Sequence, residues 1–240
     1  MISRRKNNVD AKKIARMIDI STVKAETTVA EIDRMAEIAK AFRFRCAFAM
    51  PCFTKRLVGL LSEEGDVKVG GVVGFPSGAD TTSVKIATAK EMIAVGVDEL
   101  DMVINVGALK SGLYEEVSND IRSVVETAKG LPVKCILETA HLTEDEIRRG
   151  ASIAVRAGVA YVKTGTGWAH KPTTVETVKL IRSEIGDAAR IKAAGGVRDL
   201  DTLLAMHAAG ASRFGIGISN ALSIMKEAYA RENLPWTNEA

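Results

Sequence analysis

Two lysines in similar local sequences are the residues of this chain best suited to do chemistry. Lys163 ends a short apolar run in Ala160-Tyr-Val-Lys-Thr-Gly-Thr-Gly167, and Lys192 has the same setting in Ile191-Lys-Ala-Ala-Gly-Gly-Val-Arg198. An amine becomes nucleophilic when burial or a nearby cation lowers its pKa, and converging lysines would supply that cation. A glycine turn follows each lysine, so the pattern indicates amine chemistry on a small phosphorylated carbonyl compound. The alternative is a pair of solvated lysines at strand ends.

Short apolar runs alternate along the chain with longer amphipathic segments. Apolar residues at three- and four-residue intervals predict the helices, and Thr143-Glu-Asp-Glu146 predicts a capping box. Gly96, Gly158 and Gly210 follow helix ends, where a left-handed residue favours glycine. The expected strands are Met17–Ile20, Arg45–Met50, Val67–Val73, Glu99–Asn105, Val133–Glu138, Ala160–Thr164, Arg190–Ala193 and Ser212–Gly215, and the expected helices include Thr27–Ala41, Ser83–Val95, Glu115–Lys129, Glu144–Ala157, Thr173–Ile185 and Leu200–Ala209.

Eight strand–helix units in 240 residues predict an α/β fold, a (β/α)8 barrel that forms one domain over residues 1–240. A doubly wound open sheet is the rival, but the first expected strand runs into Asp19-Ile-Ser-Thr22 without a glycine-rich fingerprint. No linker-like or low-complexity segment divides the chain.

Strand parity predicts which side chains enter the barrel. In Glu99–Asn105, the alternation places Leu100, Met102 and Ile104 on one face and Asp101 on the other. The apolar face should pack on the helices. Charged residues on the inner face are costly unless they are paired, so we expect a polar site at the top of the barrel with ion pairs beneath it.

Asp101, Lys163 and Lys192 end expected strands four, six and seven, where barrel enzymes place their catalytic groups. One lysine would form an iminium ion with a carbonyl carbon, the other would lower its pKa, and the carboxylate would move protons. The turns after strands six to eight contribute candidate substrate-binding residues, namely Thr164, Gly167, Gly195, Gly196, Gly215 and Gly217. The Gly74–Gly78 turn is interpreted as structural.

Composition excludes several other classes of protein. The net charge of +3 comes from mixed acidic and basic residues, so no nucleic-acid-binding face is expected. The three cysteines have no paired spacing, which favours a reducing compartment. The histidines lack metal-ligand spacing, and no apolar stretch is long enough to span a membrane. We therefore expect a cytoplasmic protein without a metal.

Several of these segments resemble the deoxyribose-phosphate aldolase family of Schiff-base aldolases. The resemblance runs in family order from about residue 14 to 226. The matching segments are Met17–Thr22, Val73–Gly78, Asp98–Ala108, Ile136–Thr139, Tyr161–Gly167, Ile191–Arg198 and Arg213–Gly215.

The resemblance implies a (β/α)8 barrel that reversibly cleaves 2-deoxy-D-ribose 5-phosphate to acetaldehyde and D-glyceraldehyde 3-phosphate without a cofactor. It implies that Lys163 forms the Schiff base, that Lys192 perturbs its pKa and that Asp101 shuttles protons. Asp19 matches a polar position near the substrate hydroxyls. The family also implies a role in deoxyribose phosphate catabolism, and homodimers are common in it.

Several positions depart from the usual family pattern. Gly165 replaces a serine, Trp168 is bulky, Gly217 and Ile218 lack the hydroxyls expected near the phosphate, Phe48 replaces a cysteine, and the tail 234–240 has no tyrosine. An alternative is therefore a Schiff-base aldolase of the same family that acts on another small aldol adduct. A non-catalytic barrel that binds a sugar phosphate is the third reading, although all three candidate catalytic residues are present.

Overall fold

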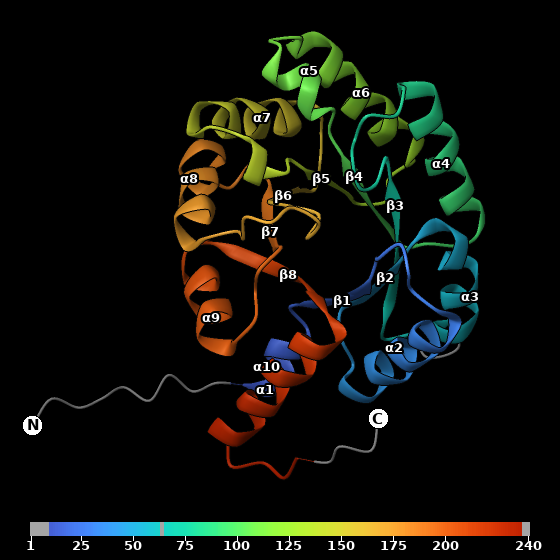
Figure 1. The fold of residues 1–240 in the computed structure, drawn as a ribbon, viewed down its shortest axis with the longest axis vertical. Coiled ribbons are helices and arrows are strands. Elements are labelled where there is room, and N and C mark those ends of the chain that lie inside the picture. Colours follow the sequence, from blue (N-terminus) through green and yellow to red (C-terminus); the bar gives the residue numbers. More distant parts are fainter. Residues whose placement is uncertain (1–9, 63–64, 237–240) are drawn as a thin grey trace, which may run out of the picture.

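The computed structural model describes residues 10–62 and 65–236. Eight parallel strands pair in chain order and close into a barrel, and the helices form an outer ring around it (Figure 1). This confirms the predicted (β/α)8 fold. The strands are β1 (Ile18–Thr22), β2 (Cys46–Ala49), β3 (Lys68–Val73), β4 (Glu99–Val103), β5 (Val133–Ile136), β6 (Tyr161–Lys163), β7 (Arg190–Ala194) and β8 (Ala211–Gly217).

Ten α-helices and one 3-10 turn connect the strands within the described residues. They are α1 (Ala11–Ala15), α2 (Val29–Phe42), α3 (Pro51–Leu61), α4 (Thr82–Ala94), α5 (Val106–Lys110), α6 (Tyr114–Thr127), η1 (Thr139–His141), α7 (Glu144–Arg156), α8 (Val175–Ile185), α9 (Leu200–Ala208) and α10 (Ile218–Arg231). Among these residues, no helix combines the length and apolar character that crossing a membrane requires.

Helix signals in the sequence account for most of these boundaries. Thr143 and Glu146 form the predicted capping box, and Gly96, Gly158 and Gly210 all have positive φ after helix ends. The sequence interpretation did not assign α3, which begins with Pro51. Proline suits the first turn of a helix because its missing N–H would have no partner there.

The apolar core lies mainly between the strands and the helices. Leu100, Met102 and Ile104 belong to this layer, as strand parity predicts. A second, much smaller apolar cluster contains Cys46 and Phe48 and borders the site described below. Charged side chains are also buried in the protein, among them Asp101, Lys134, Lys192 and Arg213.

Strand register brings these charged residues side by side. Lys163 is the register partner of Lys192, which is in turn the partner of Arg213 on β8. On β4 and β5, which precede β6 around the barrel, Asp101 is the register partner of Lys134. Side chains of register partners in neighbouring strands point the same way, so the pairing alone concentrates charge in one layer.

One buried ion pair lies outside the barrel and ties two helices to β4. The amine of Lys85 on α4 lies 2.5 Å from Asp120 Oδ2 on α6 and donates to the carbonyl of Val103 at 3.0 Å. Thr82 also donates to the Asp120 carboxylate at 2.9 Å. Lys85 is fully buried, so these partners compensate for its loss of water.

Candidate active site

The three predicted catalytic residues meet inside the barrel. The amines of Lys163 and Lys192 each lie 2.7 Å from Asp101 Oδ2. A third amine, from Lys134, lies 2.9 Å from Asp101 Oδ1. Asp101 and Lys134 are fully buried, and Lys163 is 6% exposed. One carboxylate therefore organises three lysines, of which Lys163 is the most accessible.

A second group of ionised side chains lies against these lysines. Arg213 donates to Asp19 and to Glu99, the latter at 2.7 Å, and Lys134 lies 2.8 Å from Glu99. Asp19 Oδ2 is 2.7 Å from Lys192 Nζ without hydrogen-bond alignment. The predicted ion pairs beneath the site are thus present, and Asp19 belongs to them as well as to the site.

The charges of this network balance when one lysine is neutral. Three carboxylates, from Asp19, Glu99 and Asp101, face four basic groups. Burial lowers the pKa of Lys163 to about 8; Asp101 opposes the shift, and Lys192 adds to it. Burial also opposes ionisation of Asp101, but the three lysines outweigh it and hold its pKa well below the usual range.

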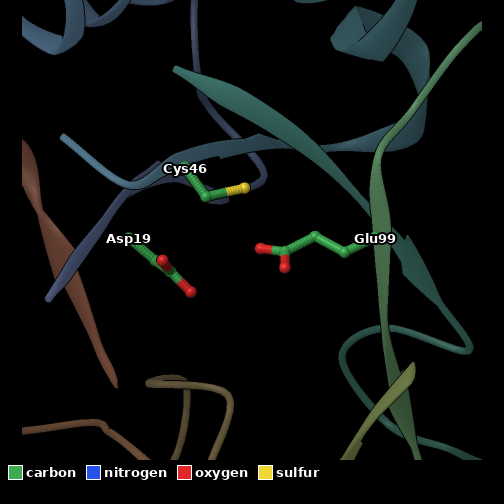
Figure 2. A group of neighbouring side chains, drawn as sticks. All are labelled: Asp19, Cys46 and Glu99. Atoms are coloured by element: carbon green, nitrogen blue, oxygen red, sulfur yellow. The ribbon is translucent and has the colours of Figure 1, made fainter. Parts of the chain in front are cut away.

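Asp19, Cys46 and Glu99 point toward one another from β1, β2 and β4 (Figure 2). Their potential ligand atoms lie within 4.8 Å of one another. Burial raises the pKa of the Cys46 thiol well above its usual value, with Glu99 and Asp19 adding to the shift. Arg213 already neutralises both carboxylates. A cation would compete with that guanidinium for a protonated thiol and two paired carboxylates, so this donor set does not fit a metal centre.

The ring of Phe48 forms one wall of the lysine cluster. The amines of Lys192, Lys134 and Lys163 lie 4.1, 4.9 and 5.9 Å from its centroid. Aromatic faces attract cations at such distances. The ring fits because the neighbouring residue on β3 is Gly70, where a Cβ atom would lie 2.0 Å from the ring. A phenylalanine in place of the usual family cysteine therefore adds an apolar, cation-stabilising surface.

A small chamber opens above Lys163. Its volume is about 30 Å³, and its lining includes Asp19, Phe48, Phe75, Lys163 and Lys192. Phe75 comes from the Gly74–Gly78 turn, which the sequence analysis interpreted as structural only. The chamber gives the Lys163 amine room for a small carbonyl group.

Trp168 lines the groove next to this chamber and contacts two of the chamber's lining residues, Val23 and Phe75. Its indole N–H donates to the carbonyl of Val23, after β1, at 2.8 Å, and its ring packs edge-on against Phe75 at 6.2 Å. On the other side, the Trp168 backbone N–H donates to Thr166 Oγ1 at 3.0 Å, and Thr166 in turn donates to Glu138. These contacts connect the ends of β5, β6 and β1.

An outer groove of about 480 Å³ adjoins the chamber. The predicted residues Gly167, Gly195, Gly196, Gly215 and Gly217 all line it. Gly195 and Gly196 have φ of 85° and 99°, which only glycine adopts readily. These turns therefore depend on glycine for their shape.

Cationic side chains and a helix N-terminus also line the groove. Lys24, Arg34 and Arg198 supply the charge. Helix α10 begins at Ile218 without a side-chain cap on its first N–H groups. Free N–H groups at a helix N-terminus favour an anion.

Thr164 is placed differently from the other predicted residues. It is fully buried, and its hydroxyl donates to the carbonyl of Ala194 at 3.0 Å and accepts from the Ala194 N–H at 2.9 Å. Its hydroxyl thus has partners within the protein and joins the end of β6 to β7, next to Lys163.

Comparisons with known proteins find relatives over most of the chain. A family model described as DeoC/LacD family aldolase matches residues 13–226. The chain is 48% identical to a deoxyribose-phosphate aldolase of Sinorhizobium medicae over 217 residues, which cover 90% of this chain and 88% of the relative. It is 45% identical to that of Rhizobium meliloti, also over 217 residues and with the same coverage of both chains.

A solved structure shows the same fold. The tetrameric deoxyribose phosphate aldolase from Aeropyrum pernix superposes with a TM-score of 0.83 at 29% identity, covering 91% of this chain and 92% of that one.

Proposed function

The chain belongs to the DeoC/LacD aldolase family, and from this premise we propose that it reversibly cleaves 2-deoxy-D-ribose 5-phosphate to acetaldehyde and D-glyceraldehyde 3-phosphate through a Schiff base on Lys163. The observation that carries the proposal is the buried Lys163 amine, 2.7 Å from Asp101 and open to the chamber, with its pKa lowered to about 8. A nucleophilic amine requires such a setting.

The arrangement supports the following steps. The neutral Lys163 amine adds to C1 of the open-chain sugar, and loss of water gives an iminium ion. A base takes the proton of the C3 hydroxyl, the C2–C3 bond breaks, and its electron pair forms an enamine with C1. Protonation of C2 and addition of water release acetaldehyde and the free amine. Asp101 is ionised in the resting site, so it suits the role of proton acceptor, acting through water. The positive charge of Lys192 adds to the effect of burial in lowering the pKa of Lys163, so a larger fraction of the amine is neutral.

The outer groove suits the phosphate end of this substrate. Lys24, Arg34 and Arg198 provide positive charge there, and α10 directs its first N–H groups into the groove. Ile218 is the first residue of that helix, so its backbone N–H can serve where its side chain cannot. The departures from the family pattern are therefore compatible with a phosphorylated substrate.

Cleavage kinetics with and without the phosphate test this substrate assignment. We expect kcat/KM for 2-deoxyribose 5-phosphate to exceed that for 2-deoxyribose by about 100-fold or more, because several charge-assisted hydrogen bonds would be lost. Arg198→Ala should reduce the ratio of kcat/KM between the phosphorylated and the unphosphorylated sugar. Arg122→Ala, on the exposed face of α6, should leave this ratio unchanged. Equal use of both sugars would favour the alternative, an aldolase of this family with a different small substrate.

The homodimer and the cytoplasmic location stay predictions. Light scattering after gel filtration measures the first, and a mass that is not twice that of the chain would contradict it.

A further inference from the structure

The chamber at Lys163 is small. Its volume of about 30 Å³ corresponds to roughly two water molecules, at about 10–15 Å³ for each. Acetaldehyde, the donor in the synthetic direction, adds only one methyl group to the reacting carbon. The residues that shape this space are therefore the ones to consider for the choice of donor.

Trp168 supports the outermost part of the chamber wall. Val23 and Phe75 line the chamber, while Trp168 lines the adjoining groove and contacts both of them. Trp168 is itself 44% exposed, so these contacts lie near the protein surface. The Trp168 indole N–H donates a hydrogen bond to the Val23 backbone carbonyl at 2.8 Å. The Phe75 ring meets the indole edge-on.

Trp168 is itself anchored from the opposite side of the barrel. Its backbone N–H is bonded to Thr166, and the Thr166 hydroxyl and N–H are bonded to the carboxylate of Glu138. Glu138 is 6% exposed and has a φ of 55°, in the left-handed region that a residue with a side chain rarely adopts. The carboxylate is thus directed at the loop that carries Trp168.

Gly165 lies directly beside this anchoring contact. A Cβ atom on residue 165 would lie 2.8 Å from Glu138 Oε1 and would force the carboxylate to move. Gly165 stands where the family commonly has a serine, and it therefore lies beside the Glu138 carboxylate that accepts a hydrogen bond from Thr166. Trp168 belongs to a hydrogen-bonded connection that runs from Glu138 through Thr166 to Val23, and Gly165 lies next to its Glu138 end.

We propose that Trp168, held by Glu138 and Thr166 and bonded to Val23, is a specificity-determining residue that restricts the donor to a two-carbon aldehyde. It acts by keeping Val23 and Phe75 in place. This inference rests on the proposed function, because it concerns the donor half of the same reaction.

Donor competition in the synthetic direction tests the proposal. With D-glyceraldehyde 3-phosphate as acceptor, kcat/KM is measured for propanal and for acetaldehyde, and their ratio is compared between proteins. Trp168→Ala should raise the ratio about tenfold or more, since one methylene in a tight pocket is worth about 10–200-fold. Trp168→Phe retains a ring but loses the bond to Val23, so it should raise the ratio less. Trp236→Ala, at the stacked cluster with Phe42, is the matched control and should leave the ratio unchanged.

The ratio separates a specificity role from general damage, which would lower both rate constants together. An unchanged ratio in Trp168→Ala and Trp168→Phe, with acetaldehyde still used, would overturn the proposal. Borohydride trapping of the wild-type protein with acetaldehyde tests the proposed function separately from the donor proposal. If no adduct forms on Lys163, the proposed function is wrong and the donor proposal falls with it.

Discussion

Removal of the Lys192 charge should make Lys163 harder to deprotonate by a calculable amount. Both amines lie 2.7 Å from the same oxygen of Asp101, so they are separated by at most twice that distance. Two unit charges about 5 Å apart repel by about 3 kcal/mol at an effective dielectric constant of about 20. Loss of that repulsion in Lys192→Met would raise the pKa of Lys163 from about 8 to roughly 10.

The rate should follow this change because only the neutral amine attacks a carbonyl carbon. The neutral fraction increases with pH and levels off above the pKa. In the wild-type protein, kcat/KM should therefore rise through about pH 8, since this parameter reports the free enzyme. In Lys192→Met the rise should move to roughly pH 10, with about a 100-fold loss at pH 7 that is largely recovered at high pH.

Two control variants complete the experiment. Lys192→Arg retains the positive charge and should keep the rise near its wild-type position. Lys226→Met removes an exposed lysine from α10 and should change nothing. A Lys192→Met profile that falls equally at every pH would show that Lys192 does not tune Lys163, and the electrostatic reasoning would be refuted.

Two further substitutions test the buried charges. Asp101→Asn removes the negative charge that raises the pKa of Lys163, so the residual activity should rise with pH at a lower pH than in the wild type; a move to higher pH would contradict the assignment. Lys85→Met leaves the Asp120 carboxylate buried without its main partner and should cost about 3–5 kcal/mol in the free energy of unfolding. Urea denaturation measures this loss of stability. Adding Asp120→Leu to Lys85→Met should recover part of the lost stability. A loss below about 1 kcal/mol in Lys85→Met would refute the proposed role of this ion pair.

Local sequence patterns were sufficient to predict most of the fold. Alternation along Glu99–Asn105 placed Asp101 in the barrel and Leu100 against the helices, because strand geometry depends only on neighbouring residues. Helix caps such as Thr143 are local in the same way. The helix that begins at Pro51 was not assigned, although proline at the first helical position is itself a local signal.

The features of the site that the sequence did not predict are those created by contacts between residues far apart in the chain. Alternation along Val133–Glu138 puts Lys134 on the inner face of its strand, but nothing in that segment identifies Asp101, 33 residues earlier, as its partner. Phe75 belongs to a turn that looks structural until the barrel brings Trp168 against it. Glu138 depends on its unusual backbone conformation, which no sequence pattern marked. Only closure of the barrel sets these neighbours side by side.

The identity of the Schiff-base lysine is the central claim, and covalent trapping tests it most directly. The protein is incubated with 2-deoxyribose 5-phosphate or acetaldehyde, reduced with borohydride, and analysed by intact mass and peptide mapping. We expect one adduct, on Lys163, and none in Lys163→Arg. An adduct on Lys192 or Lys134 in the wild-type protein, or no adduct with either compound, would contradict the account.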